Sequence, residues 1–397
     1  MKKFLNTIYS RSTVLTLFFV PILSVLLMSC KQPVVAVDEN GQIVKGGMRI
    51  TVALSPGDWL RDIVGIRMDS VLEQAIQTAE LVDFDTVETF FSRMEAAMSP
   101  NINLARYFDA NMLNVNRNDD NHTVCSALAH QWNDCRDLTL QTILRRIAHL
   151  QGSNHVSEPH GIYGTTRYYF DIIKVKDAER IVRLVSTPGQ FSVWITLDTL
   201  STRQLLTEIN DYFNGQLFWM IANPHNMIGW ESMAKDKEKI DSLLALAAPD
   251  RVYDSRWVKF LWSPVKQRGL YANVNQFVSH DIAELYAIEV STRDGSPLLD
   301  GRCVEKAEVD NDWISLKLNA EGKREWARIT GENVGRAIAT VIDNKVFSAP
   351  IVMSEISNGY MGVSGFESVE EIEDMANILS SGRLAAGTKV VEVQVGE

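Results

Sequence analysis

The sequence has little of what marks disulfide scaffolds, membrane bundles and nucleic-acid binders. Only four of its 397 residues are cysteine, too few for a disulfide framework to hold the fold. After Cys30, no apolar run reaches the ~18 residues that a transmembrane helix needs. Acidic residues outnumber basic ones by 50 to 39, which argues against nucleic acid, whose binding depends on Lys and Arg at phosphates. With 46% hydrophobic residues, the body is expected to fold as ordinary globular domains.

Motifs that carry catalysis or cofactors are also missing. No nucleophile elbow, phosphate loop or dinucleotide fingerprint occurs. The segment Gly331–Gly335 (GENVG) shares only its glycines with such loops and follows an expected helix rather than a strand. His155 and His160 lie in a polar loop without a companion nucleophile. We therefore expect no catalytic residue, no cofactor and no enzymatic activity.

Two groups of residues imitate metal sites. His122, Cys125, His130 and Cys135 have knuckle-like spacing, but on a helix they would point around the axis instead of converging. The acidic residues Asp310, Asp312 and 367–374 lack the central glycine and the twelfth-position glutamate of a calcium loop. Glu370 and Glu371 fit better in the first turn of a helix, where the helix dipole favours negative charge. No metal is expected at either group.

A disulfide between Cys125 and Cys135 depends on the shape of the chain between them. An oxidising compartment would favour the bond. A continuous helix would separate the two residues by ~15 Å, beyond the ~7 Å between Cα atoms that a disulfide tolerates. The bond is therefore possible only if the helix breaks near Asn133, and Cys303 has no evident partner.

The N-terminus has the pattern of an export signal. Lys2, Lys3 and Arg11 precede an uncharged stretch, residues 12–29, which ends in Leu27-Met28-Ser29-Cys30. This ending resembles the lipobox of bacterial lipoproteins, in which the cysteine thiol accepts a diacylglyceryl group. Residues 1–29 are thus expected to be a lipoprotein signal peptide, Cys30 the lipid attachment site and residues 30–45 a tether. An uncleaved signal anchor is the alternative; both place the body outside the cytoplasm.

The remaining chain alternates strand and helix patterns. Strands are expected at 48–54, 167–173, 191–197, 257–262, 284–292, 313–319, 336–342, 345–347, 351–356, 360–364 and 388–395. Helices are expected at 63–81, 85–98, 123–150, 176–185, 202–213, 236–247, 321–334 and 368–381. A tight turn is expected at Asp343-Asn344, because both residue types tolerate positive φ. The alternation suggests an α+β fold with a ferredoxin-like, split βαβ arrangement.

The stretch from Leu285 to Val393 resembles the protein-export factor SecD, most closely its fused SecDF forms. The resemblance follows, in order, residues 285–287 (LYA), 299–301 (LDG), 319–322 (NAEG), 326–330 (WARIT), 332–335 (ENVG), 339–343 (ATVID), 348–350 (SAP), 363–365 (VSG), 369–371 (VEE) and 379–382 (LSSG). Residues 45–48, 142–150, 176–180 and 258–262, with Phe191 and Trp194, agree with it upstream. Residues 170–175 (FDIIKV) and 384–387 (LAAG) depart from it, and the sequence stops at Glu397, where the family enters its transmembrane helices.

This resemblance implies the large periplasmic domain of SecD. The expected parts are a base subdomain from residues 46–189 and 305–397, with an inserted α+β head subdomain at 190–304. The family's role implies a non-catalytic accessory of protein export without its own proton-driven motor. Its expected partners are unfolded preproteins or Sec translocon components, and it is held by lipid on a bacterial membrane with its body in the periplasm. The alternative is a binding lipoprotein that keeps this fold but recognises another ligand.

Overall fold

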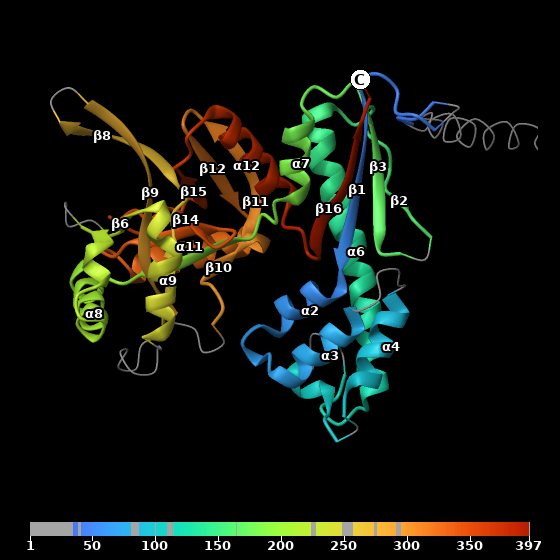
Figure 1. The fold of residues 1–397 in the computed structure, drawn as a ribbon, viewed down its shortest axis with the longest axis horizontal. Helices are drawn as coiled ribbons and strands as arrows, with labels where there is room; N and C mark the ends of the chain where they lie inside the picture. The colour runs from blue at the N-terminus through green and yellow to red at the C-terminus, as the bar shows by residue number, and fades with distance from the viewer. Residues whose placement is uncertain are drawn as a thin grey trace, which may run out of the picture.

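The computed structural model describes residues 35–38, 41–80, 87–99, 101–108, 113, 115–163, 165–223, 228–247, 257–273, 276–290 and 295–396. These residues form a mixed helix and strand fold with two lobes, one on each side of Figure 1. Each lobe has its own hydrophobic core. Among the helices in the described ranges, none is long and apolar enough to cross a membrane.

The first lobe joins the N-terminal part of the chain to its last strand. Its elements are β1 (Gly47–Ser55), α2 (Pro56–Val64), α3 (Ser70–Glu80), α4 (Val87–Ala97), α6 (Asn121–Gln151), β2 (His160–Gly161), β3 (Arg167–Ile173), α7 (Ala178–Ser186) and β16 (Gly387–Val395). The sheet has the order β16-β1-β3-β2, and all neighbouring strands are antiparallel.

Apolar side chains alternate with mostly polar ones along β1, which gives this sheet an apolar and a polar face. Met48 and Ile50 are fully buried in the core of the first lobe. On the opposite face, Arg49 pairs with Asp171 of β3 at 2.7 Å and lies over the ring of Tyr169. The helices of the lobe therefore cover only one face of its sheet.

The long helix predicted at 123–150 is confirmed as α6. Asp120 caps its start by accepting a hydrogen bond from the backbone N–H of Thr123 at 2.7 Å, and Gly152 ends it with a φ of 91°. Trp132, fully buried, packs edge-on against Trp59 of α2. In Figure 1, this helix runs along the length of the first lobe.

The second lobe contains the residues between α7 and β16. Its elements are β4 (Phe191–Thr196), α8 (Thr199–Tyr212), β5 (Ile221–Ala222), β6 (Trp230–Met233), α9 (Lys237–Leu246), β7 (Trp257–Trp262), β8 (Lys266–Asn273), β9 (Gln276–Val290), β10 (Leu299–Asp300), β11 (Val304–Asp310), β12 (Trp313–Leu318), α11 (Ala320–Glu332), β13 (Ile338–Ile342), β14 (Lys345–Ser348), β15 (Tyr360–Val363) and α12 (Val369–Ser381). A three-stranded sheet has the order β11-β12-β15.

The larger sheet of this lobe curls into a ring. It has the order β10-β4-β13-β14-β7-β9-β6-β5, and an additional pairing of β4 with β9 closes a ring of five strands. Trp194, Tyr286 and Val341 belong to the apolar cluster on one side of these strands. Lys259 lies with its Nζ 3.2 Å from the centre of the Trp194 ring, and burial lowers the pKa of its amine to about 8.

Strand pairing groups the residues differently from the expected division at residue 305. In the larger sheet, β13 pairs with β4 and β14 with β7, so residues 338–348 lie in one sheet with residues 191–262. Of the segment after residue 305, only β16 joins the first sheet. Residues on both sides of position 305 group together because Phe191, Val193 and Leu299 share one apolar core with residues of β12, α11 and α12.

Several predicted elements differ in extent from the structure. The strand predicted at 351–356 is wrong, because only Ile351 makes an isolated bridge, to Ala337. The strand predicted at 284–292 is the end of β9, which begins at Gln276 and forms a hairpin with β8. The turn predicted at Asp343-Asn344 is confirmed, with φ values of 49° and 61°.

Candidate functional site

Two chain segments connect the lobes, residues 187–190 and 382–386, and Arg146 of α6 binds both. Its guanidinium donates to the carbonyl oxygens of Leu184 (2.9 Å), Thr187, Pro188 (3.1 Å) and Gly382 (2.7 Å). The Arg146 side chain is completely buried. Burial lowers the pKa of the guanidinium to about 10, which leaves it charged at neutral pH. One buried cation therefore fixes both connections between the lobes.

The first connecting segment is held so closely that it requires glycine at residue 189. Gly189 has a φ of 75°, a left-handed conformation that residues with a Cβ adopt at a cost. A Cβ there would lie 2.5 Å from Cγ2 of Ile378 and 2.8 Å from Nη2 of Arg146. The backbone N–H groups of Gly189 and Gln190 donate to the carboxylate of Asp343. The segment is thus anchored by groups from both lobes.

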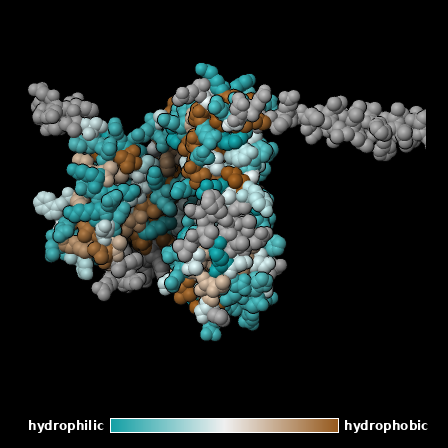
Figure 2. Space-filling view, turned by 45° about the vertical axis from the view of Figure 1, so that its right-hand side comes forward, coloured by the Kyte–Doolittle hydropathy of each residue, from teal (hydrophilic) through white to brown (hydrophobic). Residues whose placement is uncertain are grey.

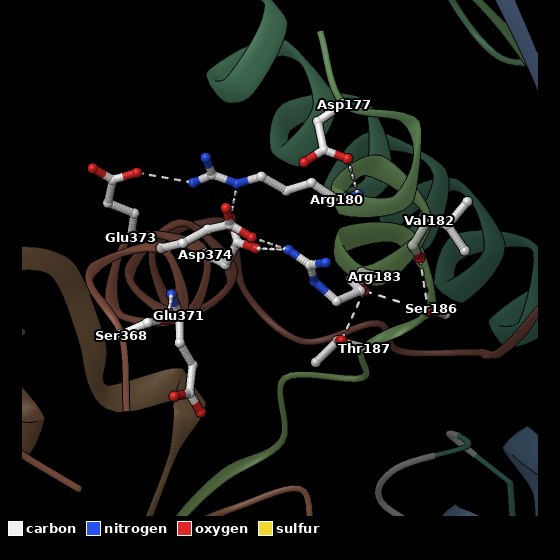
Figure 3. A network of polar contacts seen from close by, with 11 residues as sticks. Asp177, Arg180, Val182, Arg183, Ser186, Thr187, Ser368, Glu371, Glu373 and Asp374 are labelled. Carbon is white, nitrogen blue, oxygen red and sulfur yellow. Dashed lines mark hydrogen bonds and ion pairs between the residues drawn. The ribbon is translucent and has the colours of Figure 1, made fainter. Parts of the chain in front are cut away.

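Two helices from different lobes face each other beside these connections, and their charges are complementary (Figure 3). Arg180 of α7 contacts Asp374 of α12 through Nε at 2.5 Å, and Glu373 through Nη2 at 2.9 Å. Arg183 of α7 pairs with Glu370 and also approaches Asp374 at 3.4 Å. Arg180 and Asp374 are largely buried, with side chains 17% and 12% exposed. We call these five residues the junction ladder.

Removing the central pair of the junction ladder should show how strongly the lobes are coupled. In a double-mutant cycle of Arg180→Gln and Asp374→Asn, we expect a coupling energy of about 1–3 kcal/mol, because both side chains are largely buried. The exposed pair Arg328–Glu325 on α11 is the control and should give about 0.2–1 kcal/mol. Denaturant unfolding of the four variants in each cycle gives both values, and equal coupling in the two pairs would contradict a special role for the ladder.

A cavity lies on each side of the junction ladder. The larger, about 800 Å³, is lined by the end of α6, by Arg180, by α12 and by β11, with Leu150 and Val309 among its apolar residues. The smaller, about 620 Å³, lies on the side of Arg183. Figure 2 shows the hollow between the two lobes, with hydrophobic side chains on parts of its walls. These surfaces offer apolar and charged contacts side by side.

Comparison with known proteins gives a family match within the second lobe. Residues 286–386 match the family model described as the SecDF P1 head subdomain. The SecD translocase subunit of Rhodothermus marinus is 26% identical over 396 aligned residues, which cover 89% of this chain. This chain carries a SecD-type periplasmic domain. It spans 61% of the length of that relative.

Further comparisons give one relative over a shorter stretch and two solved structures. The SecD subunit of Leptotrichia buccalis is 39% identical over 111 residues, which cover 26% of this chain and 28% of the relative. A solved SecDF in its super-membrane-facing form has a TM-score of 0.42 at 17% identity, covering 96% of this chain and 35% of the other. A SecDF described as a membrane component that enhances protein export has a TM-score of 0.36 at 20% identity, covering 65% and 92%.

In the SecD-type domain, the residues that imitate a zinc knuckle are spread along α6. Cys125 is buried, His130 is exposed, and His122 lies 3.2 Å from the carboxylate of Glu95. The helix continues without a break through Asn133, so Cys125 and Cys135 are free thiols on one helix. Burial raises the pKa of Cys125 to about 12 and that of Cys135 to about 11. Both thiols are therefore protonated at neutral pH.

The other residues considered from sequence have local structural positions. His155 contacts the carbonyl of Gln151 at the end of α6, and the ring of His160 packs against Tyr169. Asp310 and Asp312 are exposed at the turn between β11 and β12. Glu370 and Glu371 lie in the first turn of α12, as predicted. Across the described ranges, no group of three or more His, Cys, Asp or Glu could hold a metal ion. Cys30 lies outside the described residues.

Sequence reasoning missed the junction ladder, although the signal was present. Arg180 and Arg183 are three residues apart, as are Glu370 and Glu373, and each pair lies on one face of its helix. Two helices with opposite charges at this spacing are candidates for pairing across a domain boundary. Arg146 gave no comparable signal, because its partners are backbone carbonyls, which no sequence pattern marks.

Proposed function

We propose that this chain is a non-catalytic, SecD-like accessory of protein export that holds translocating polypeptide on the extracytoplasmic side of a bacterial membrane. The observation that carries the proposal is the match of residues 286–386 to the SecDF P1 head subdomain. The R. marinus relative, similar over 89% of this chain, is a protein translocase subunit. The proposed partners are unfolded preproteins and components of the Sec translocon.

The two lobes are proposed to be the base and the head of this domain. The strand order β16-β1-β3-β2 reads 4-1-3-2 in chain order, with α6 and α7 as the two crossover helices. A split βαβ, ferredoxin-like base has this order. The head would then be residues 191–381, inserted between α7 and β16. The family match, which continues to residue 386, favours this division over one at residue 305.

The hollow between base and head is the proposed place for the polypeptide. An unfolded chain presents apolar side chains and unpaired backbone groups at once, so its binding surface needs both kinds of contact. The larger cavity supplies Leu150 and Val309 together with Arg180 and Glu308. None of these side chains is a nucleophile set beside a base, which fits holding rather than cutting.

A lipid at Cys30 is proposed to keep the domain at the membrane. Two or three acyl chains bury enough methylene groups, at about 0.8 kcal/mol each, to anchor a protein stably. Labelling of the chain by a radioactive fatty acid in cells should disappear in Cys30→Ala. A Cys303→Ala variant is the control and should be labelled like the wild type. Label that persists in Cys30→Ala would contradict the anchor.

Co-purification tests the proposed function itself. The full chain, purified from detergent-solubilised membranes after crosslinking, is expected to carry Sec components or secretory precursor proteins. The same purification is made with the double variant Arg180→Gln, Asp374→Asn, in which the lobes are uncoupled. The amounts of Sec components and precursor proteins recovered with the two chains are then compared. Recovery of a single unrelated ligand with no Sec component or precursor would favour the alternative, a binding lipoprotein of the same fold.

A further inference from the structure

The last strand of the base, β16, has one open edge. It pairs with β1 on one side, and no strand of the described residues pairs with its other side. In Figure 1, β16 is the strand of this sheet nearest to the head. With nine residues it is about 30 Å long at ~3.4 Å per residue. It is therefore a long strand edge on the side where the two lobes face each other.

The backbone groups that point outward from this edge can be assigned from one hydrogen bond. Gly396 donates its N–H to the carbonyl of Gly47 at 2.9 Å, next to the pairs Val395–Met48 and Ile50–Val393. In an antiparallel ladder, bonded and non-bonded pairs alternate. Val395 and Val393 thus fall in the non-bonded pairs, and their N–H and C=O groups point away from β1.

Apolar side chains accompany these free backbone groups. Val391, Val393 and Val395 are 39%, 40% and 50% exposed. Val393 lies opposite Ile50, and Val395 opposite Met48, both fully buried on the apolar face of the sheet. The apolar face of the base therefore continues to the edge and stops there half-exposed. A strand added beside β16 would extend it.

Two other strand edges of the molecule are protected. The opposite edge of the base sheet is β2, which has only two residues. The edge of β11 is attached to α12, because Ser380 Oγ accepts from the N–H of Ala307 and donates to its carbonyl, both at 2.9 Å. Proteins usually shorten or cover strand edges in such ways. Apart from a bulge at Val391, β16 is a long edge that no strand of the described residues covers.

We infer that an extended segment of translocating polypeptide binds β16 as a fifth strand of the base sheet. This inference rests on the proposed function and names the binding mode. Backbone hydrogen bonds would accept many sequences, as an export factor needs, and the valine row would favour segments with alternating apolar residues.

A second copy of the chain fits this edge less well. A strand pair about 30 Å long and roughly 10 Å thick buries about 300 Å² per partner, well below the roughly 800 Å² of a stable interface. Two copies would also each carry a net charge of −11, which opposes association. The small area suits a ligand that must be released.

Binding of synthetic peptides to the full chain in detergent tests the inference. One peptide alternates valine and lysine; the other differs only by N-methylation of alternate residues, which removes donors on one edge. The wild type should bind the first at least about tenfold more tightly, a difference of about 1.4 kcal/mol.

Val393→Pro removes an outward N–H without breaking a bond to β1 and should weaken binding by a similar factor. A triple variant, Val391→Thr, Val393→Thr and Val395→Thr, keeps the β-branched shape and should also bind weakly. Val334→Thr, at an exposed valine of the head, should bind like the wild type.

Three outcomes would overturn the inference: unchanged binding in both the proline and the threonine variants, equal binding of the N-methylated peptide, or a concentration-dependent dimer that Val393→Pro abolishes. Crosslinking in cells separates this failure from failure of the proposed function. If secretory polypeptide still crosslinks to the Val393→Pro chain as to the wild type, only the β16 mode is lost. If it crosslinks to neither, the proposed function fails as well.

Discussion

Replacing Arg146 by methionine is expected to lower the free energy of unfolding by about 3–5 kcal/mol. The substitution removes the donor of four carbonyl oxygens, three of them on the two segments that connect the lobes. A buried acceptor left without a donor costs about 1–3 kcal/mol. The total is smaller than four such costs because some of these carbonyls can accept hydrogen bonds from water when the lobes separate slightly. The loss should appear in denaturant unfolding followed by tryptophan fluorescence.

The neighbouring arginine provides the control for this prediction. Arg145 is exposed on the same helix and bonds only within its own turns, so Arg145→Met should change stability by no more than about 0.5 kcal/mol. Arg146→Lys keeps the charge but not the planar fork of donors, and should restore only part of the loss. A loss below about 1 kcal/mol in Arg146→Met would mean that this side chain does not fix the lobe connections.

Gly189→Ala is expected to destabilise the protein by about 2–4 kcal/mol. Part of the cost, about 1–2 kcal/mol, comes from a Cβ in the left-handed region. The rest comes from overlap with Ile378 and Arg146, which must move within a packed junction. Thermal or denaturant unfolding measures the sum.

A second glycine separates these two costs. Gly335 has a similar φ of 84°, but nothing lies within 4 Å of the position its Cβ would take. Gly335→Ala should therefore show only the backbone cost, about 1–2 kcal/mol. If the free energy of unfolding falls equally in both alanine variants, the close packing of Gly189 between the lobes does not contribute to stability.

Local sequence patterns predicted the elements whose stability is local. The helix α6 follows from its apolar spacing and its capping residues, and the turn at Asp343-Asn344 follows from residue types that tolerate positive φ. The strand β11 was missed because it is an edge strand with a single buried residue, Ala307, among charged ones. Patterns of alternation report burial, so a strand that is mostly exposed gives no signal.

The grouping of elements into lobes depends on contacts far apart in the sequence. The last strand, β16, pairs with β1, so the sheet of the first lobe combines segments from both ends of the chain. The pairing of β13 with β4 could not be predicted, because both strands are fully buried and would read alike in either lobe. The contacts of Arg146 could not be predicted for a different reason: its partners are backbone carbonyls, which every residue has.

Crosslinking from the larger cavity tests the central claim most directly. Val309 lines this cavity and is 43% exposed, whereas Val334 of the second lobe, 54% exposed, is not among the residues that line it. A photoreactive residue placed at each position would be activated in cells while export of a secretory protein is stalled. We predict an adduct with that protein from position 309 and none from position 334. No adduct from position 309, or equal adducts from both positions, would contradict the account.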